Sequence, residues 1–392
     1  LYGEMINSSH ILSTSLASIC PLPPKHCSQT VGFIRIEPMV EYIGVERIRE
    51  LVGRLGPAQF MAGLAAEIEA DYRRWDEFEK SPRHATHSPV GVIELMPISD
   101  GHQYSFKYVN GHPKNTGEGL LTVTAFGVLA DVDSGYPILL SELTLTTAFR
   151  TAAMSALAAR WMAREGSRTM ALIGNGAQAE FQIIAFHHML GIRSVRLYDV
   201  DPAATAKLAR NLDALALSGL EVVRCSSVAQ AVEGADIVTT ATADKRNAVI
   251  ITPEMVRDGM HLNAIGGDCP GKTELHPDIL RRPDARIVVE YGPQSRIEGE
   301  VQQLDPTHPV IEFADVVSGK VPGRANDREV TIFDSVGFAL EDFSSLRYLH
   351  RLHNEIGGTR RTLDLIPSMK DPKDLFGELA GAQSARARVR VV

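Results

Sequence analysis

Short apolar runs alternate with amphipathic segments from Thr169 onward, and this alternation constrains the fold more than any other feature of the sequence. Apolar runs such as MALI, VRLY and DIVTT are separated by segments of helical periodicity such as AEFQIIAFHHML. Alternating β and α segments are typical of a parallel sheet with helices packed on both of its faces. We therefore predict an α/β fold in which residues 151–330 form a Rossmann-type, doubly wound parallel sheet.

The residues before this region follow a different pattern. Apolar residues recur every three or four positions between Val40 and Lys80, with a Gly-Pro break at 56–57, which predicts two amphipathic helices. The Ala-rich segment Thr144–Arg164 contains no Gly or Pro and predicts a long helix. Short β-rich runs lie between these helices, over Val90–Met96, Tyr104–Val109, Leu120–Leu129 and Ile138–Leu140. We predict a strand-rich α+β domain for substrate binding and dimerisation over residues 39–150, to which residues 331–392 return with a helix over Phe338–Leu352.

Composition narrows the class of protein. The 392 residues exceed one average domain, and the net charge of -8 provides no basic surface for nucleic acid. The four cysteines form no CxxC pair or zinc-type spacing, so we expect a reducing cytoplasm and no metal. No apolar run approaches the about 18 residues of a membrane span. Residues 1–38, interrupted by Pro21, Pro23, Pro24 and Pro38, are expected to form a loosely ordered extension.

A dinucleotide fingerprint follows the first apolar run of the alternating region. Residues 174–179 read GNGAQA, a GxGxxA form in which Gly174 permits a tight turn and Gly176 lets a pyrophosphate approach the backbone. The next apolar run ends at Asp199, where a carboxylate can bind both ribose hydroxyls of NAD and would repel the 2′-phosphate of NADP. Asp201 is an alternative for the same role. The pattern predicts NAD as the cofactor, with its phosphates at a helix N-terminus.

The segment Gly266–Leu275, GGDCPGKTEL, follows the apolar run HLNAI and formally matches the Walker pattern of P-loop proteins. A phosphate-binding role is physically poor, because Asp268 would put a carboxylate beside phosphates and Pro270 lacks a backbone N–H. Open α/β sheets bind ligands at the carboxyl ends of their strands, so the loop can instead present Asp268 and Lys272 to a nicotinamide. We predict a catalytic loop, with a structural ion pair as the alternative.

Six segments, in a fixed order, are similar to a known family. They are VGVIELMP, FKYVNGHPKNT, FGVLADVDSGYPILLSELTLTTAFRTAA, ALIGNGAQAEFQ, HLNAIGGDCPGKTEL and FDSVGFALED. The chain resembles the ornithine cyclodeaminase and mu-crystallin family over about residues 39–380, and in detail its bacterial ornithine cyclodeaminases. The resemblance implies a homodimer that converts L-ornithine to L-proline and ammonia with NAD used catalytically. It also implies a place in ornithine catabolism, arginine degradation and proline biosynthesis.

The resemblance implies roles for residues around the substrate. Arg83, Lys107 and Arg150 match cationic positions around the substrate carboxylate, with Arg150 also near the nicotinamide. A carboxylate that leaves water needs charge-assisted partners of this kind. Glu94 matches a carboxylate placed for a substrate amino group, and Val336 matches a position beside the substrate.

The resemblance also implies roles in catalysis and cofactor binding. Asp268 matches the proposed catalytic acid/base, which takes a proton from the substrate and returns it to the leaving ammonia. Lys272 matches a residue that contacts the cofactor. Further cofactor-lining positions are Thr122, Arg150, Gly174, Gly176, Ala177, Gln178, Asp199, Thr242, Leu262, Asn263, Ala264, Ile265, Gly266, Gly267 and Ser335.

Two other classes of function stay open. One is an alanine dehydrogenase or cyclic-imine reductase of the same family, which would consume or produce reduced NAD(P). The other is a binding protein without enzymatic activity. The presence of Lys107, Arg150, Asp268 and Lys272 together argues against a pure binder, which has no need of all four.

Overall fold

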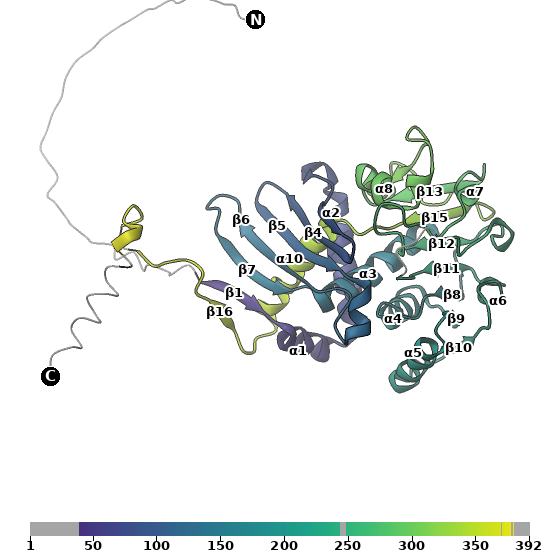
Figure 1. The fold of residues 1–392 in the computed structure, drawn as a ribbon, viewed down its shortest axis with the longest axis horizontal. Helices are drawn as coiled ribbons and strands as arrows, with labels where there is room; N and C mark the ends of the chain where they lie inside the picture. Colours follow the sequence, from purple (N-terminus) through teal and green to yellow (C-terminus); the bar gives the residue numbers. More distant parts are fainter. Residues whose placement is uncertain (1–38, 244–247, 370, 378, 380–392) are drawn as a thin grey trace, which may run out of the picture. The chain divides into compact units, whose positions relative to one another are not determined.

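The computed structural model describes residues 39–243, 248–369, 371–377 and 379 (Figure 1). The extension expected over residues 1–38 lies outside the described residues. Two sheets organise the described chain, and both have the character that the sequence predicts, one strand-rich and largely antiparallel and one entirely parallel. None of the helices within the described ranges combines the length and hydropathy needed to cross a lipid bilayer.

The first sheet has the strand order β16-β1-β7-β6-β5-β4-β2, with β3 paired to β4. Its pairs are antiparallel except for β1 with β7. The strands alternate between buried and exposed residues, as in β4, so one face packs on a core and the other faces outward. The bounds are β1 Val40–Ile43, β2 Glu79–Lys80, β3 His84–Ser88, β4 Gly91–Ser99, β5 Gln103–Gly111, β6 Ala125–Asp131, β7 Pro137–Glu142 and β16 Arg361–Leu363.

Helices cover the inner face of this sheet. Gly56, with a φ of 81°, ends α1 and Pro57 starts α2, so the predicted two helices and the break between them are confirmed. Helix α10 packs against α2, β4, β5 and β6, which brings the C-terminal part of the chain back to the first sheet. The bounds are α1 Val45–Leu55, α2 Pro57–Arg73, α3 Thr144–Met162 and α10 Ala339–Glu355, with 3-10 turns η1 Trp75–Glu77 and η2 Pro113–Glu118.

The second sheet is parallel throughout, with the order β10-β9-β8-β11-β12-β15-β13-β14. The order reverses between β8 and β11, which is the switch point where open α/β sheets bind ligands. Its strands are β8 Thr169–Ile173, β9 Ser194–Tyr198, β10 Glu221–Arg224, β11 Ile237–Thr240, β12 His261–Ala264, β13 Ala285–Val289, β14 Ile311–Glu312 and β15 Val330–Asp334. Its helices and 3-10 turns are α4 Ala179–Leu190, α5 Pro202–Leu215, α6 Val228–Val232, η3 Pro253–Met255, α7 Pro277–Leu280, α8 Gly292–Glu298, η4 Glu300–Gln303 and α9 Phe313–Val317.

Strand β15 differs from the sequence prediction. The boundary expected at residue 330 cuts through this strand, because residues 331–334, assigned to the first domain, lie in the second sheet between β12 and β13. All five residues of β15 are buried, so the strand completes the parallel sheet before the chain crosses to α10. The crossing segment 335–338 therefore joins the two sheets directly at the carboxyl edge of the second.

Candidate active site

The glycine turn after β8 has space for a ligand at one glycine and none at the other. Gly174 has a φ of 95°, and a Cβ there would lie 2.5 Å from the carbonyl oxygen of Ala241, so only glycine fits. A Cβ at Gly176 would meet no atom within 4 Å. The turn therefore packs against the Ala241 backbone at Gly174 and has free space at Gly176, which is the side suited to a dinucleotide phosphate.

The helix that follows this open side suits an anion. The N-terminus of α4 has no side-chain cap, so its backbone N–H groups and the positive end of its dipole are available to an anion. The turn from Gly174 to Ala179 fits a dinucleotide pyrophosphate.

Asp199 lies at the end of β9, facing the same turn. Its Oδ2 accepts a hydrogen bond from the Asn175 backbone N–H at 2.6 Å, and its Oδ1 accepts one from the Asp201 N–H at 2.8 Å. Asp201, the alternative ribose ligand, instead caps α5 by accepting from the Ala203 N–H at 2.9 Å. Asp199 is therefore the carboxylate that touches the glycine turn.

The segment after β12 is built around a buried acid that the sequence analysis did not single out. Three residues of β12 are buried, namely Leu262, Asn263 and Ala264. Gly266, which comes after β12, lies so close to Glu274 that a Cβ at this position would collide with the Glu274 carboxylate. Glu274 Oε1 accepts hydrogen bonds from the backbone N–H of Thr242, at 2.9 Å, and from the Thr242 hydroxyl. Glu274 thereby fixes Thr242, after β11, beside Gly266.

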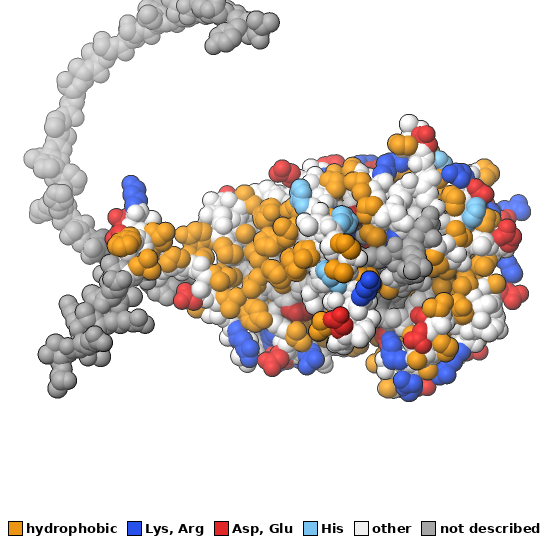
Figure 2. All heavy atoms as spheres, viewed as in Figure 1, with side chains coloured by type: hydrophobic (Ala, Val, Ile, Leu, Met, Phe, Trp, Pro, Cys, Tyr) orange, Lys and Arg blue, Asp and Glu red, His pale blue; other side chains and the backbone are white. Residues whose placement is uncertain are grey.

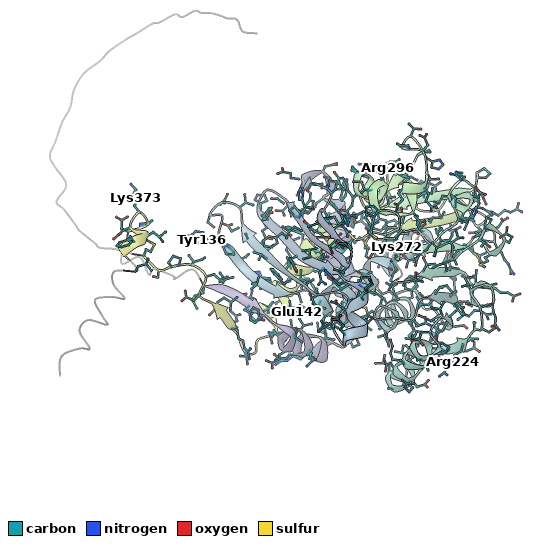
Figure 3. The ribbon with its side chains drawn as sticks, viewed as in Figure 1. Tyr136, Glu142, Arg224, Lys272, Arg296 and Lys373 are labelled. Atoms are coloured by element: carbon teal, nitrogen blue, oxygen red, sulfur yellow. The ribbon has the colours of Figure 1, made fainter. Side chains whose placement is uncertain are left out.

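Asp268 and Lys272 form an ion pair on the next part of this loop. Lys272 Nζ lies 3.3 Å from Asp268 Oδ1 and donates to the Thr242 carbonyl at 2.9 Å, and in Figure 3 it lies between the two sheets. Its side chain is 3% exposed, whereas that of Asp268 is 53% exposed. A buried lysine therefore supports an aspartate whose outer oxygen is accessible to a ligand.

Gln302 of η4 holds the loop that carries Asp268 and Lys272 through hydrogen bonds to its backbone. Gln302 Oε1 accepts from the Gly271 N–H at 2.7 Å, and Gln302 Nε2 donates to the Lys272 carbonyl at 3.2 Å. No helix starts at Lys272: the chain runs on to the four-residue α7, which begins at Pro277. The architecture is that of a braced loop at a strand end and differs from a P-loop, in which a helix opens at the Lys-Thr pair.

Arg83, which follows β2, connects the first sheet to the crossing segment. Its Nη1 donates to Glu94 of β4 at 3.1 Å, and its Nη2 donates to the carbonyls of Val336 and Gly337, both at 2.6 Å. Its Nε lies 3.1 Å from Oε2 of Glu298, at the end of α8. Burial disfavours the charged guanidinium, but Glu94 and Glu298 outweigh it and raise the pKa of Arg83.

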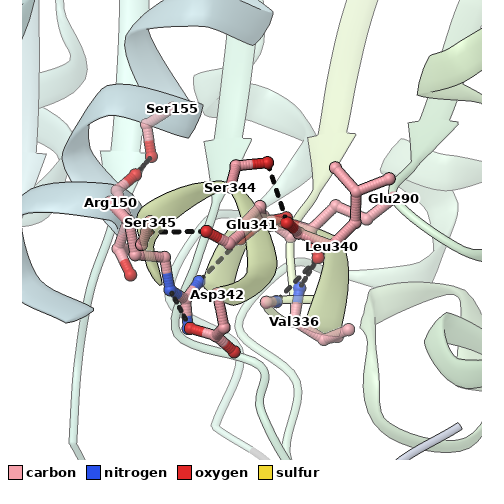
Figure 4. Close-up of polar contacts among 12 residues, drawn as sticks. Arg150, Ser155, Glu290, Val336, Leu340, Glu341, Asp342, Ser344 and Ser345 are labelled. Atoms are coloured by element: carbon pink, nitrogen blue, oxygen red, sulfur yellow. Dashed lines mark hydrogen bonds and ion pairs between the residues drawn. The ribbon is translucent and has the colours of Figure 1, made fainter. Parts of the chain in front are cut away.

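Lys107 and Arg150 share a second set of acids. Lys107 on β5 lies 2.7 Å from Asp342, and Arg150 on α3 lies 2.7 Å from Glu341 and 3.3 Å from Asp342, as Figure 4 shows for Arg150. Burial lowers the pKa of Lys107 to about 8, with a smaller contribution from the neighbouring Arg150, while Asp342 opposes the shift. Gly337 packs against the Arg150 guanidinium, since a Cβ there would lie 2.8 Å from Nη1.

Glu290 and Glu341 are fully buried and lie near each other and near Arg150. Burial raises the pKa of both carboxyl groups, and the charge of Arg150 opposes the rise. Glu290 accepts from the Ser335 hydroxyl at 2.6 Å and from the N–H groups of Val336 and Gly337 at 3.1 and 2.7 Å. The pair therefore holds the crossing segment on one side and, through Glu341, Arg150 on the other (Figure 4).

The structure places most of the predicted residues at the carboxyl edge of the second sheet or on the elements that face it. Thr122 lies on a different element, the segment between η2 and β6, where its carbonyl accepts from the His112 N–H at 2.8 Å. Three acids that hold the cations were not predicted from the sequence, namely Glu298, Glu341 and Asp342. Two of them stand in the motif FDSVGFALED, where charge in an apolar stretch was a usable signal. The buried acids Glu274 and Glu290, which accept hydrogen bonds from the loops around the site, were not predicted either.

A parallel sheet with a glycine turn at its switch point, faced by a second domain that contributes buried cations, defines a two-domain dinucleotide-binding protein of the Rossmann type. The chain belongs to the ornithine cyclodeaminase/mu-crystallin family, whose model matches residues 46–355.

Individual relatives agree with this assignment. An ornithine cyclodeaminase of Agrobacterium fabrum (strain C58) is 56% identical over 350 residues, which cover 89% of this chain and 97% of that protein. The solved structure of a lysine cyclodeaminase matches this chain with a TM-score of 0.77 and 29% identity, over 86% of this chain and 99% of that one. That structure describes the recognition of L-lysine, L-ornithine and L-2,4-diaminobutyric acid by the lysine cyclodeaminase. An archaeal alanine dehydrogenase dimer with bound NAD matches with a TM-score of 0.74 and 27% identity, over 84% and 100% of the two chains.

Proposed function

We propose that this protein is an NAD-dependent ornithine cyclodeaminase, which converts L-ornithine to L-proline and ammonia. The observation that carries the proposal is the 56% identity, over nearly the whole length of both chains, to the Agrobacterium fabrum ornithine cyclodeaminase. Identity to an alanine dehydrogenase of Archaeoglobus fulgidus is 33%, and identity to a Delta(1)-pyrroline-2-carboxylate reductase of Bacillus cereus is 30%. These relatives with other reactions are more distant from this chain.

NAD would be held at the switch point of the second sheet. Gly174 and Gly176 shape the phosphate site, the N-terminus of α4 faces the phosphates, and Asp199 is placed for the ribose. Lys272 and Thr242 lie toward the other end of the site. When bound there, NAD supplies a reversible two-electron oxidation of the substrate at Cα and is restored when proline forms, so none is consumed.

The substrate carboxylate would bind among Arg83, Lys107 and Arg150. The side chains of all three cations are buried and already lie beside carboxylates, so each is held in position before a substrate binds. A substrate carboxylate that joins them gains charge-assisted hydrogen bonds from groups that need little rearrangement. This preorganisation would fix Cα relative to the cofactor.

Asp268 would move the proton at the side-chain amine. A free amine has a pKa near about 10.4 and is protonated at neutral pH, so it cannot attack Cα until a base removes its proton. Asp268 is exposed on one side and supported by Lys272 on the other, which suits a group that accepts this proton and later returns it to the leaving ammonia.

A product assay tests the proposal. Protein incubated with L-ornithine and a trace of NAD should release proline and ammonia in equal amounts, with no net NADH, and the reaction should stop when NAD is removed. If NADH accumulates in proportion to ornithine consumed, without proline, the protein is a dehydrogenase of the same family and the proposal is wrong.

We further propose that the protein works as a homodimer through the outer face of the first sheet. Leu95, Tyr108 and Phe126 are aligned across β4, β5 and β6 on this face, and Figure 2 shows hydrophobic side chains gathered over the same strands. Sheet faces that contact water are normally polar, and contiguous apolar surface of this kind usually marks an interface. Cytoplasmic location and a role in ornithine and arginine catabolism and in proline biosynthesis stay predictions that accompany this function.

A further inference from the structure

The surroundings of Arg83 contain more acid than the guanidinium needs. Glu94 and Glu298 are both in ion pairs with it, their side chains are 7% and 5% exposed, and Asp268 is close enough to affect the pKa of both Arg83 and Glu298. The three carboxylates come from β4, the end of α8 and the loop after β12. Arg83 thus pairs with two of these acids and Lys272 with the third, so three carboxylates on different elements face two cations.

Glu298 is the acid among them with unused capacity to accept a hydrogen bond. Its Oε2 lies 3.1 Å from Arg83 Nε, yet within the described residues neither atom makes a hydrogen bond, since the two groups are not aligned. A buried carboxylate oxygen without a donor is costly, and such atoms are rare unless a ligand completes them. Because the neighbouring Arg83 Nε is not aligned with it, Glu298 Oε2 can accept a hydrogen bond from a ligand.

We propose that Glu298 is a third acidic residue of the substrate site, which accepts a hydrogen bond from the side-chain ammonium of the substrate together with Glu94 and Asp268. The inference rests on the proposed function, because it needs a substrate that carries a carboxylate at one end and an ammonium at the other. Glu298 would thus help the site to select diamino acids over amino acids with apolar side chains.

The charges favour this assignment over a purely structural one. A substrate ammonium adds one positive charge, and it offsets the repulsion among the three carboxylates that Arg83 and Lys272 leave. Burial raises the pKa of Glu298 to about 7; Arg83 opposes this rise, and Glu94 and Asp268 add to it. At neutral pH the free protein thus holds Glu298 partly protonated, and a bound ammonium would draw it to the charged form.

The test compares two ligands that differ only in the side-chain amine. L-Ornithine is the substrate, and L-2-aminopentanoic acid, which has the same carbon chain without the amine, is used as a competitive inhibitor of proline formation. In Glu298→Gln we expect the KM for ornithine to rise roughly tenfold or more, as for the loss of a charge-assisted hydrogen bond, while the Ki of 2-aminopentanoic acid stays within about twofold.

A structural role predicts a different result. If Glu298 only holds Arg83 in place, both constants rise together, because Arg83 is a ligand of the carboxylate that both molecules share. That result, or an unchanged KM for ornithine, overturns the proposal. Should Glu298→Gln fail to fold, Glu298→Asp keeps the charge with a shorter reach, and the same split between KM and Ki supports the proposal while its absence overturns it.

The pH profile gives a second readout. In the parent protein kcat/KM for ornithine should rise with pH through about 7, as Glu298 ionises, and fall above about 8, as Lys107 loses its proton. Glu298→Gln should lose the acid limb and keep the alkaline limb. An acid limb that persists unchanged in Glu298→Gln contradicts the proposal.

Two controls separate this inference from the proposed function. Glu329→Gln removes another acid in an ion pair, 3.0 Å from Arg286, at the opposite end of the second sheet, and should leave both constants unchanged. The parent protein must first form proline from ornithine. If it does not, the proposed function fails; if it does and Glu298→Gln behaves like Glu329→Gln, only the inference about Glu298 fails.

Discussion

Asp268 and Lys272 divide exposure between them in a way that suits proton transfer. The lysine is buried against the Thr242 carbonyl, whereas the aspartate is 53% exposed. Replacing Asp268 with Asn keeps its shape and removes the base. We expect kcat for proline formation to fall by roughly 10² or more, which is the usual contribution of general acid–base catalysis. Steady-state assays at saturating ornithine measure this loss.

Asp278→Asn is the matched control for that variant. Asp278 is the second residue of α7, its side chain is 63% exposed, and it pairs with the surface residue Arg281. Its replacement should change kcat by less than about twofold, since exposed ion pairs contribute little. If Asp268→Asn is no slower than Asp278→Asn, Asp268 is not the acid/base of the reaction.

Single residues could be predicted from sequence only where their role is local. Gly174 is recognisable because a tight turn between a strand and a helix needs a positive φ, and the structure gives it one. Glu290 and Glu298 could not be found in this way. Their burial and their raised pKa arise from elements that are far apart in the chain, and neither lies in a sequence pattern that marks an acid as buried.

Among the elements, the turn from β8 to α4 offers a matched pair of glycines. A Cβ at Gly176 meets open space, whereas one at Gly174 meets the Ala241 backbone. We expect Gly176→Val to leave the free energy of unfolding within about 1 kcal/mol of the parent and to raise the Kd for NAD tenfold or more, because the new side chain occupies the side from which the phosphates approach. Titration calorimetry and denaturant unfolding measure the two quantities.

In Gly174→Ala we expect the main loss in the free energy of unfolding, whereas in Gly176→Val we expect it in the affinity for NAD. The strained φ of 95° and the contact with Ala241 should lower the free energy of unfolding by roughly 1–3 kcal/mol. Equal loss of stability in the two variants would mean that the space at Gly176 is not free for a ligand.

Helix boundaries could be predicted from the sequence where the apolar periodicity ends at a helix-breaking pair of residues. The Gly-Pro pair at 56–57 placed the boundary between α1 and α2 correctly, because it interrupts a clear helical period. Residues 331–334 of β15 were wrongly assigned to the first domain, because a short strand of five residues does not show in the sequence which sheet it joins. Its neighbours, β12 and β13, precede it by tens of residues, so only the three-dimensional fold places it in the second sheet.

For the whole molecule, the first sheet has a different role on each face. Residues that alternate along β4 and β5 send Glu94 and Lys107 inward and Leu95 and Tyr108 outward. The inner face contributes charge to the site, and the outer face presents apolar side chains. The period of two in these strands would therefore connect the proposed substrate binding with the proposed association, because the same backbone positions both sets of side chains.

Association through the outer face can be tested with one charge. Phe126 on β6 is 42% exposed and stacks on Tyr108, the central residue of the apolar row, with 5.1 Å between ring centroids. The parent should have a mass in solution of two 42.7 kDa chains, and Phe126→Glu should have the mass of one, because the buried charge is costly in an apolar interface. Sedimentation equilibrium measures both masses.

Leu215→Glu, at the end of α5 and also 42% exposed, is the control that should keep the parent mass. A monomeric parent, or a Phe126→Glu variant that stays paired, would place the interface elsewhere or remove it.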